Sequence, residues 1–395
     1  MPRTACRPAF SWWAGPTTTR PSSPRASPTR PPPAAGMAPL PPAPPCPSEV
    51  PMKTIFSDRH ALQSVEREFY RGGWVEAFEI PRRAELVRAA VTRAGLGPVM
   101  APEPFDLGPV LAVHDAAFVR FLEGAWESWT AEMGPIPAYP NLWPPRRSRS
   151  IPTVRPGAEL GRYAVDMSSP ILAGTWEAAR AAVDCALTGV VLIEAGEPAA
   201  FALCRPPGHH AGRDYFGGYC FLNNAAIAAQ QFRSLGAARV AVLDIDYHHG
   251  NGTQDIFYDR GDVLTVSVHG DPVQEYPYYI GFADETGEGE GEGTNLNLPL
   301  PWGADFAAYR RALTEGLARI RAFAPDRLVV SLGVDTFAGD PISHFRLESG
   351  DYPQIGAMIA ALGLPTLFVM EGGYAIEAIG ENVVHLLEGF EAARG

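Results

Sequence analysis

The sequence has few cysteines and no long apolar run, and each shortage excludes a class of protein. Its 395 residues include five cysteines, none in CxxC or CxxH spacing, so a disulfide framework is excluded. Cys185, Cys204 and Cys220 are predicted to be buried thiols of a reducing compartment. No apolar run reaches the roughly 18 residues that span a membrane, and the N-terminus lacks the continuous apolar region of a secretion signal. We therefore expect a cytoplasmic protein that does not bind membranes.

Acidic residues outnumber basic ones outside the N-terminus. The formal charge is −12, and the first 51 residues contribute +4 from five arginines and one acid, so the remainder carries −16. This balance disfavours nucleic acid as a partner and raises the local concentration of cations, including cationic substrates.

Residues 1–51 differ in composition from the rest of the chain. Fifteen of the 40 prolines lie in the first 50 positions. Such a segment cannot bury enough apolar surface to offset the entropy lost on ordering. We predict a proline-rich disordered extension at 1–51 and a single folded domain at 52–395.

From residue 52 onward, segments of strand type and helix type alternate. Short apolar runs rich in β-branched residues are typical of buried parallel strands: MKTIFS, AAFALC, RVAVLDIDY, VLTVSVH, DRLVVSLG and PTLFVM. The segments between them predict helices at 83–95, 175–196, 221–235, 305–323, 351–362 and 379–394. The alternation indicates an α/β fold with a mostly parallel, multi-stranded sheet flanked by helices.

Polar residues gather where the predicted strands end. Ligands of open α/β sheets bind beyond the carboxyl ends of the strands. Five strands here are followed by RPPGHHAG, DYHHGNG, HGDP, VDTFAGDP and EGGY. Because these endings converge on one edge of the sheet, they predict an active site.

The DIDYHH segment carries the first candidate metal ligands. Residues two apart on a strand point to the same side, so Asp244, Asp246 and His248 should line up, with His249 pointing away. Asp335, which follows another strand, is the natural third ligand beside Asp246 and His248. Two carboxylates and one imidazole suit a divalent ion such as zinc and leave a position open for water. The simpler interpretation, that Asp246 and His248 cap the next helix, does not account for the other strand endings.

His209 and His210 follow RPPG and are predicted to form an acid–base pair. Amide hydrolysis needs a base for the attacking water and an acid for the leaving amine. Each ring needs a partner that fixes its tautomer, and Asp244 and Asn251 are the candidates. Since a carboxylate raises the basicity of a histidine more than an amide does, the two rings should differ in pKa. Tyr374, after EGG, is placed to hydrogen-bond a developing oxyanion.

Two loops carry further signals. Residues 135–157 are long, proline-rich and aromatic, and residues 284–293, DETGEGEGEG, are acidic and glycine-rich. A phosphate-binding role for the second loop is rejected, because its glutamates would repel phosphate and no helix with clear start signals follows. It is either a solvated loop or a negative collar that attracts a cationic substrate.

In this order, six motifs resemble those of the zinc-dependent histone deacetylase family: RPPGHHAG, FGGYCFLNNAAIAA, DIDYHHGNGTQDIFY, SVHGDP, LVVSLGVDTFAGDP and EGGY. The resemblance covers about residues 52–395 and is strongest to bacterial acetylpolyamine amidohydrolases and class II deacetylases. It implies the arginase–deacetylase fold and one zinc ion per chain, held by Asp246, His248 and Asp335.

The same resemblance assigns roles around the metal. Asp244 and Asn251 become the partners of the two catalytic histidines, His209 and His210. Tyr374 matches the transition-state tyrosine of the family.

A second, monovalent ion, K⁺ or Na⁺, is also implied by the resemblance. Its ligands would be Asp244 and Ser267, together with the main-chain carbonyls of Asp246 and His248.

Gly218, Tyr219 and Tyr276 match the walls of the acyl-lysine tunnel of the family. The polyamine enzymes of the family are homodimers in which a long loop narrows the tunnel of the neighbouring subunit. Residues 135–157 have the length and character for that role, so a homodimer is expected.

The sequence departs from the polyamine enzymes where acids should meet the distal ammonium of the substrate. The corresponding stretch offers Glu159 and Asp166, and Ser168 stands where a glutamate is expected. Ile342 is apolar where polyamine-selective eukaryotic relatives carry a gatekeeper glutamate.

The sequence therefore predicts a zinc-dependent amidohydrolase that removes acetyl groups from a small cationic amine, an acetylated polyamine of the N-acetylputrescine or N-acetylcadaverine type. One alternative is deacetylation of acetyl-lysine proteins or of another small acylated amine. Two others are an arginase-like binuclear manganese hydrolase and a non-catalytic acyl-lysine reader. A binuclear manganese site needs an additional bridging carboxylate, but this sequence has Gly333 two residues before Asp335, where that carboxylate would stand. The reader is disfavoured because the metal ligands and Tyr374 are intact.

Overall fold

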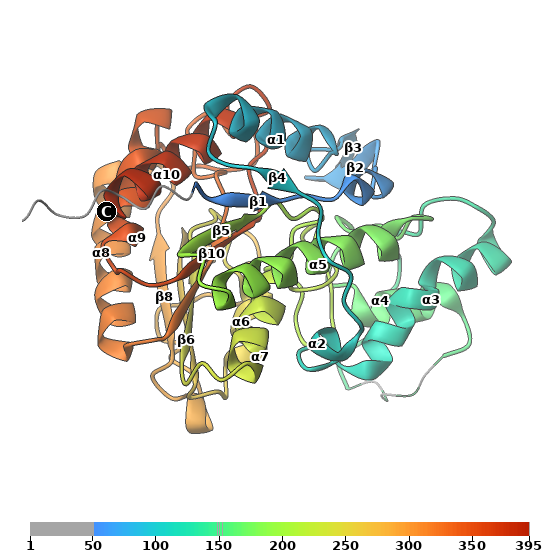
Figure 1. Cartoon of the computed structure of the whole chain (residues 1–395). Coiled ribbons are helices and arrows are strands. Elements are labelled where there is room, and N and C mark those ends of the chain that lie inside the picture. The colour runs from blue at the N-terminus through green and yellow to red at the C-terminus, as the bar shows by residue number, and fades with distance from the viewer. Residues whose placement is uncertain (1–50, 148, 150, 152, 395) are drawn as a thin grey trace, which may run out of the picture. The chain divides into compact units, whose positions relative to one another are not determined.

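The computed structural model describes residues 51–147, 149, 151 and 153–394. Apart from Pro51, the predicted extension lies outside these residues. An eight-stranded sheet has the order β4-β1-β5-β10-β9-β6-β7-β8, and each neighbouring pair is parallel (Figure 1). In that order the strands are β4 (Val99–Met100), β1 (Lys53–Ile55), β5 (Ala199–Ala202), β10 (Thr366–Met370), β9 (Arg327–Leu332), β6 (Val240–Asp244), β7 (Val263–Gly270) and β8 (Asn295–Leu300). The predicted parallel sheet is therefore present.

Helices cover both faces of this sheet (Figure 1). One face packs against α1 (Arg82–Ala94), α8 (Phe306–Phe323), α9 (Tyr352–Ala360) and α10 (Ile379–Ala393). The other packs against α5 (Thr175–Glu194) and α6 (Asn224–Ser234), with α2 (Gly108–Leu111), α3 (Ala116–Met133), α4 (Pro156–Tyr163) and α7 (Asn251–Phe257) in the same core. All six predicted helices are present. Among the described residues, no helix is long and apolar enough to cross a membrane.

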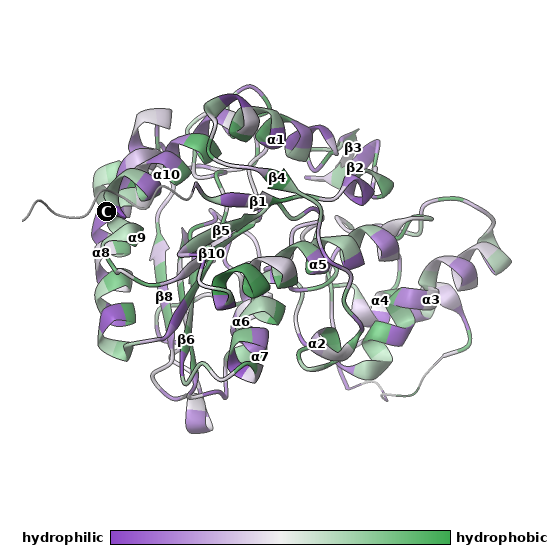
Figure 2. Cartoon of the chain, in the orientation of Figure 1, coloured by the Kyte–Doolittle hydropathy of each residue, from purple (hydrophilic) through white to green (hydrophobic). Residues whose placement is uncertain are grey.

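The alternation of side chains along the strands divides the core into two halves. On β9, Leu328 and Val330 belong to the core beneath α8–α10, whereas Val329 belongs to the core beneath α5 and α6. Consecutive strand residues point to opposite faces, so a strand buried on both faces must be apolar throughout. Figure 2 shows this as a predominance of green along the central strands.

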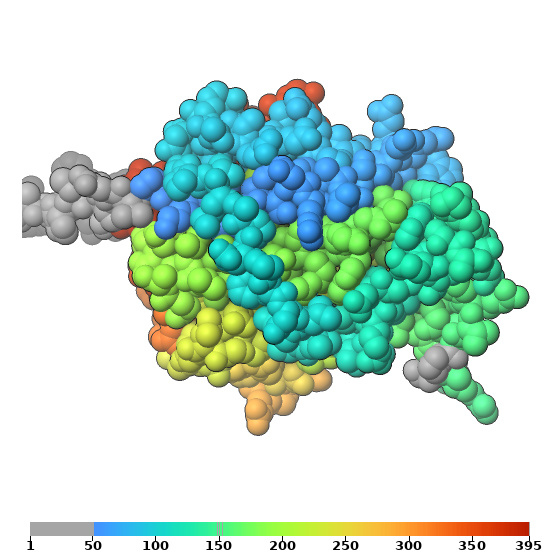
Figure 3. Space-filling view, turned by 45° about the vertical axis from the view of Figure 1, so that its right-hand side comes forward, coloured from blue at the N-terminus to red at the C-terminus, as the bar shows by residue number. Residues whose placement is uncertain are grey.

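The connection between β4 and α2 runs over α5 on the surface (Figure 3). Glu103 N donates a hydrogen bond to Thr188 Oγ1, and the Arg180 guanidinium donates to Phe105 O. These bonds fix a segment without regular structure against the helix that covers the sheet.

Several elements go beyond the predicted set. They are α2, α3, α4, α7, the edge strands β4 and β8, and an antiparallel hairpin of β2 (Arg67–Tyr70) and β3 (Gly73–Glu76). The predicted loop at 135–157 is slightly too long, because α4 begins at Pro156. The fixed φ of proline suits the first turn of a helix, which explains the position of this boundary.

Candidate active site

The carboxyl ends of four neighbouring strands, β5, β10, β9 and β6, bring the predicted site residues together. The loops after these strands carry His209, His210, Asp246, His248, Asp335 and Tyr374. All six side chains are buried. The predicted site residues therefore lie together at the strand ends, where the sequence placed them.

The predicted strand through Asp246 and His248 is wrong in its extent, because β6 ends at Asp244. Asp244 Oδ1 accepts a hydrogen bond from Asp246 N, and Asp246 Oδ1 accepts one from His248 N. Such bonds to the backbone two residues on are turn-forming, and they take the chain out of the sheet. Ile245 and Tyr247 still enter the apolar core, so the predicted separation of the two sides holds without a strand.

The candidate metal ligands converge on one point. Ligand atoms of Asp246, His248 and Asp335 all lie within 4.8 Å of one another. His248 Nδ1 is 3.0 Å from Asp335 Oδ2 and 3.5 Å from Asp246 Oδ1. Burial and the neighbouring Asp246 carboxylate raise the pKa of Asp335 to about 8. Two carboxylates held this close repel each other in a buried site, and a divalent cation would offset that repulsion.

Two glycines leave the space that this arrangement needs. A Cβ atom at Gly333 would lie 2.0 Å from Asp246 Oδ2, and one at Gly372 would lie 2.5 Å from the Oδ2 atoms of Asp246 and Asp335. Two carboxylates and an imidazole are a donor set that suits zinc. The residues present thus fit one divalent ion, and the crowding at Gly333 leaves no room there for the bridging carboxylate of a binuclear manganese site.

The two histidines have different partners. His209 Nδ1 lies 2.9 Å from Asp244 Oδ2, and His210 Nδ1 lies 2.7 Å from Asn251 Oδ1. Burial opposes a charge on His209, but the Asp244 carboxylate overcomes this effect and raises the pKa of His209 to about 10. Burial and the charge of His209 hold the pKa of His210 well below its ordinary value. The predicted difference between the two rings is confirmed.

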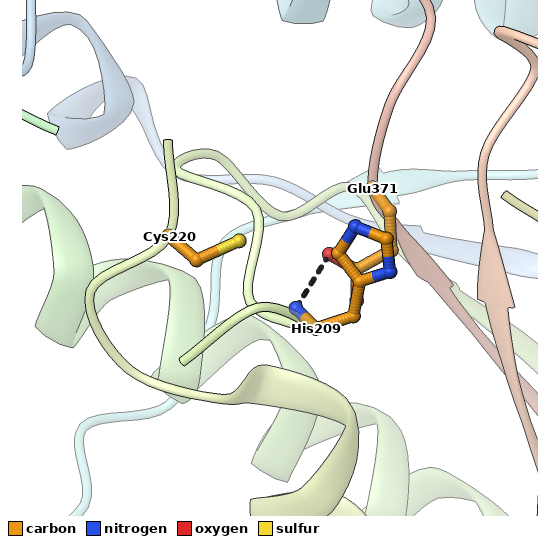
Figure 4. A group of neighbouring side chains, drawn as sticks. All are labelled: His209, Cys220 and Glu371. Atoms are coloured by element: carbon orange, nitrogen blue, oxygen red, sulfur yellow. Dashed lines mark hydrogen bonds between the residues drawn. The ribbon is translucent and has the colours of Figure 1, made fainter. Parts of the chain in front are cut away.

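A second group of ligand-type side chains lies beside the first: His209, Cys220 and Glu371 (Figure 4). Glu371 Oε2 accepts hydrogen bonds from Gly208 N and His209 N, so it anchors the loop that carries both histidines. Burial raises the pKa of the Cys220 thiol well above its ordinary value. A protonated thiol is a poor metal ligand, and the His209 ring is already engaged by Asp244. We therefore assign this group to holding the loop.

A pocket of about 280 Å³ leads to the candidate metal ligands. At its buried end lie His210, His248 and Tyr374. Its walls include the predicted tunnel residues Gly218, Tyr219 and Tyr276, and also Ser168 and Ile342. At its exposed end lie Phe69, Tyr70, Arg71 and Tyr278.

The acidic residues of the pocket differ in part from those that the sequence suggested. Asp166 lines the pocket, whereas Glu159 lies on α4 and pairs with Arg162. Glu68 and Glu275, which the sequence did not single out, line it as well. Burial raises the pKa of Glu68 to about 7. The YRGG turn after Glu68 was a readable hairpin signal, but it does not show what the hairpin packs against.

The acidic loop 284–293 contributes nothing to the described lining of this pocket. Glu285 Oε2 instead accepts hydrogen bonds from Gln254 Nε2 and Gly281 N. Of the two interpretations of the loop, a solvated loop agrees with the structure and a collar around the pocket does not.

His249 is buried away from the candidate metal ligands, as expected from the sequence. Its ring contacts Ser267 Oγ and Gln254 Oε1. Asp244 and Ser267 are register partners on β6 and β7, which places both predicted ligands of the monovalent ion on adjacent strands. That ion site stays a prediction.

Tyr374 is held from two sides. Its backbone N–H donates to Asp340 Oδ2 at 2.7 Å, and the Arg83 guanidinium lies 4.6 Å from its ring centroid. Arg83 also donates to Glu371 O and Gly373 O, both in the segment that leads directly into Tyr374. Burial raises the pKa of the Tyr374 hydroxyl well above its ordinary value, so this group stays a hydrogen-bond donor.

One buried carboxylate links this turn to the loop of the histidines. Glu79 contacts the Arg83 guanidinium at 2.8 Å and the Arg205 guanidinium at 2.8 Å through both of its oxygens. Arg205 begins the RPPG segment that leads to His209. All three charged side chains are buried, so Glu79 offsets two positive charges at once.

Comparison with known proteins agrees with this geometry. Residues 77–390 match the family described as "Histone deacetylase domain". The chain belongs to the histone deacetylase family. The parallel sheet and its strand-end site are accordingly those of the arginase–deacetylase fold, as predicted.

Several proteins named as acetylpolyamine amidohydrolases are similar to this chain over most of its length. "Acetylpolyamine amidohydrolase 2" of Pseudomonas aeruginosa is 53% identical over 340 residues, which cover 86% of this chain and 99% of that protein. "Acetylpolyamine amidohydrolase" of Mycoplana ramosa is 51% identical, with the same coverage. The crystal structure of an acetylpolyamine aminohydrolase from Burkholderia pseudomallei is 44% identical and has a TM-score of 0.83, covering 87% of this chain and 100% of that one.

Glu79→Ala should destabilise the protein by about 3–5 kcal/mol, because it leaves two buried guanidinium groups without a counter-charge. The matched control is Glu85→Ala, which removes a partly exposed acid paired with Arg82 at 3.4 Å and should cost less than about 0.5 kcal/mol. Denaturant unfolding of both variants measures the difference. Equal free energies of unfolding for the two variants would contradict the role given to Glu79.

Proposed function

We propose that the protein is a zinc-dependent amidohydrolase that removes the acetyl group from a small acetylated polyamine. The observation that supports this most directly is the buried end of the pocket. There His210, His248 and Tyr374 face a single space whose walls are two tyrosines, Tyr219 and Tyr276. A linear acyl-amine chain fits such a narrow aromatic pocket. The named activity of the similar proteins agrees with this substrate class.

Asp246, His248 and Asp335 would hold the zinc ion. When bound there, zinc supplies Lewis-acid polarisation of the amide carbonyl and lowers the pKa of water. The three ligands come from two strand ends and are buried, so their positions are fixed before substrate enters.

His210 is the proton carrier in this proposal. Its Nδ1 faces the Asn251 amide oxygen, which accepts hydrogen bonds and cannot donate one, so Nδ1 carries the hydrogen and Nε2 is the free base. Because the pKa of His210 is held low, the ring is neutral and can take the proton of the attacking water. The proton then passes to the nitrogen of the leaving amine as the C–N bond breaks, which releases acetate and the free amine.

His209 and Tyr374 stabilise the charge that develops. His209 is paired with Asp244, whose carboxylate favours the protonated ring, so a positive charge on His209 would lie next to the reacting centre. The Tyr374 hydroxyl lines the buried end of the pocket, where it can donate to the carbonyl oxygen as that oxygen becomes negative.

The pocket favours a cationic substrate. Glu68, Asp166 and Glu275 all line it, and a buried acid attracts the ammonium group of an acyl-amine. The runner-up is an acetyl-lysine protein, which would present the same acyl chain but also needs room for a polypeptide at the mouth. Phe69, Tyr70 and Tyr278 surround that mouth.

The test compares turnover of N-acetylputrescine, N-acetylcadaverine and an acetyl-lysine peptide by the zinc-loaded protein. The acetylated diamines should have the higher kcat/KM, since their free ammonium reaches the acidic part of the pocket. Metal analysis of the purified protein should give about one zinc per chain. A peptide preferred by tenfold or more would contradict the substrate, and the absence of bound zinc would contradict the metal.

Tyr374→Phe should lower kcat by roughly 10²- to 10³-fold with zinc retained, which is the effect of losing one oxyanion donor. Tyr278→Phe is the matched control, since this tyrosine is 49% exposed at the mouth of the same pocket. Steady-state kinetics and metal content are measured for both variants. Loss of zinc from Tyr374→Phe, or equal effects in the two variants, would contradict the role of Tyr374.

We further propose that the loop 135–155 forms a homodimer contact. It exposes apolar side chains at Leu142 (62%), Ile151 (54%) and Val154 (95%), and burying them against a second copy would remove apolar surface from water. Trp143 Nε1 donates to Ala164 O, so the residue that follows α4 helps to hold this part of the loop in place.

The doubly substituted variant Leu142→Asp/Val154→Asp should be monomeric at concentrations where the unmodified protein is dimeric. Val273→Asp is the control, because Val273 is 73% exposed on a different loop. Light scattering of the full chain measures the mass of each. A monomeric unmodified protein at micromolar concentration would contradict the proposal.

A further inference from the structure

The turn of the β2–β3 hairpin places a positive charge at the mouth of the pocket. Tyr70 pairs with Gly73, so Arg71 and Gly72 form a two-residue turn. Their φ angles are +48° and +85°, which is the left-handed region that such turns require. Glycine, asparagine and aspartate adopt this conformation readily, whereas arginine does so less often. An arginine in this conformation beside a pocket invites a functional explanation.

Arg71 lies at the mouth. It lines the pocket with Phe69 and Tyr70, and its guanidinium is 5.0 Å from the centroid of the Tyr70 ring. Burial raises the pKa of both Tyr70 and Tyr278, and the charge of Arg71 opposes that rise in each. Arg71 is therefore close to tyrosines from two separate segments of the chain. No carboxylate among the residues that the structure describes forms an ion pair with it.

Acidic side chains line the same pocket further inside. Glu68 is buried three residues before Arg71 and accepts hydrogen bonds from the Tyr219 hydroxyl and Phe78 N. Asp166 accepts from the Tyr276 hydroxyl on the other wall. A substrate chain that extends outward from the buried end therefore passes these acidic side chains before it meets the positive charge of Arg71.

We propose that Arg71 limits the substrate to acetylated amines with one cationic centre, by repelling a second ammonium group at the mouth. This inference rests on the proposed function and adds the substrate's length and charge. N8-acetylspermidine tests it directly, because it is N-acetylputrescine with an aminopropyl group on its distal nitrogen. The first cation has the same position in both compounds, and the second cation of N8-acetylspermidine extends outward, toward Arg71.

The experiment measures kcat/KM for both compounds with the zinc-loaded protein and with Arg71→Gly. Glycine fits the turn, so the hairpin should keep its structure. The ratio of N8-acetylspermidine to N-acetylputrescine should rise about five-fold at low ionic strength, which is the size expected for two like charges a few Å apart in water-like surroundings. The gain should appear mainly in KM, and it should shrink at about 0.5 M salt because of screening.

Two further variants isolate the cause. Arg71→Lys keeps the charge and should keep the original ratio. Arg93→Gln removes a positive charge from an exposed position of α1, outside the pocket lining, and should also keep it. An unchanged ratio in Arg71→Gly, or an equal rise in Arg93→Gln, would overturn the proposal.

Calorimetric binding of putrescine and spermidine to the same proteins separates this proposal from the proposed function. If no variant hydrolyses an acetylated amine, the proposed function is wrong. The ratio of the two dissociation constants then still decides the role of Arg71. A five-fold shift toward spermidine in Arg71→Gly supports it, and no shift overturns it.

Discussion

Four buried carboxylates, Asp244, Asp246, Asp335 and Glu371, lie at the carboxyl edge of the sheet. The structure around them depends on the hydrogen bonds that stabilise their charge. Each accepts hydrogen bonds from backbone N–H groups of the neighbouring loops, as when Gly372 N donates to Asp246 and Gly208 N to Glu371. Asp335 likewise accepts from Tyr247 N. Because a buried charge without partners costs several kcal/mol, the loops must fold around these acids. The same bonds tie the ends of β5, β6, β9 and β10 to one another.

Two buried arginines, Arg83 and Arg205, show the same constraint in the segments that hold the catalytic loops. Glu79 lies between Arg83 and Arg205, and these two side chains reach the turn of Tyr374 and the loop of the histidines. A proton carrier and an oxyanion donor act together only when their separation is fixed. Because both guanidinium groups bind the same carboxylate, Glu79 fixes this separation. Neither arginine can move away without leaving a buried charge unpaired.

The candidate metal ligands could be predicted from the sequence, because the rules that place residues at strand ends are local. Alternating strands and helices place Asp246 and Asp335 at strand ends whatever the details of packing. The extent of β6 was misjudged at Asp246, since the bonds that end the strand depend on side-chain geometry. Glu68 could not be assigned to the pocket, because its burial comes from a contact with Tyr219, 151 residues further along the chain.

The residues proposed to act on the substrate and the residues proposed to select it lie in different parts of the fold. The groups that carry the chemistry lie on adjacent strand ends, where the register of the sheet sets their spacing. The walls and mouth come from segments that are distant in sequence, among them the hairpin with Arg71 and the segment with Asp166. These segments contribute side chains to the pocket. The hydrogen bonds that hold Asp246 and Glu371 come from other parts of the chain, the backbone N–H groups of Gly372 and Gly208. A change of charge at the mouth can therefore alter which amine enters without disturbing the carboxylates that fix the reacting groups.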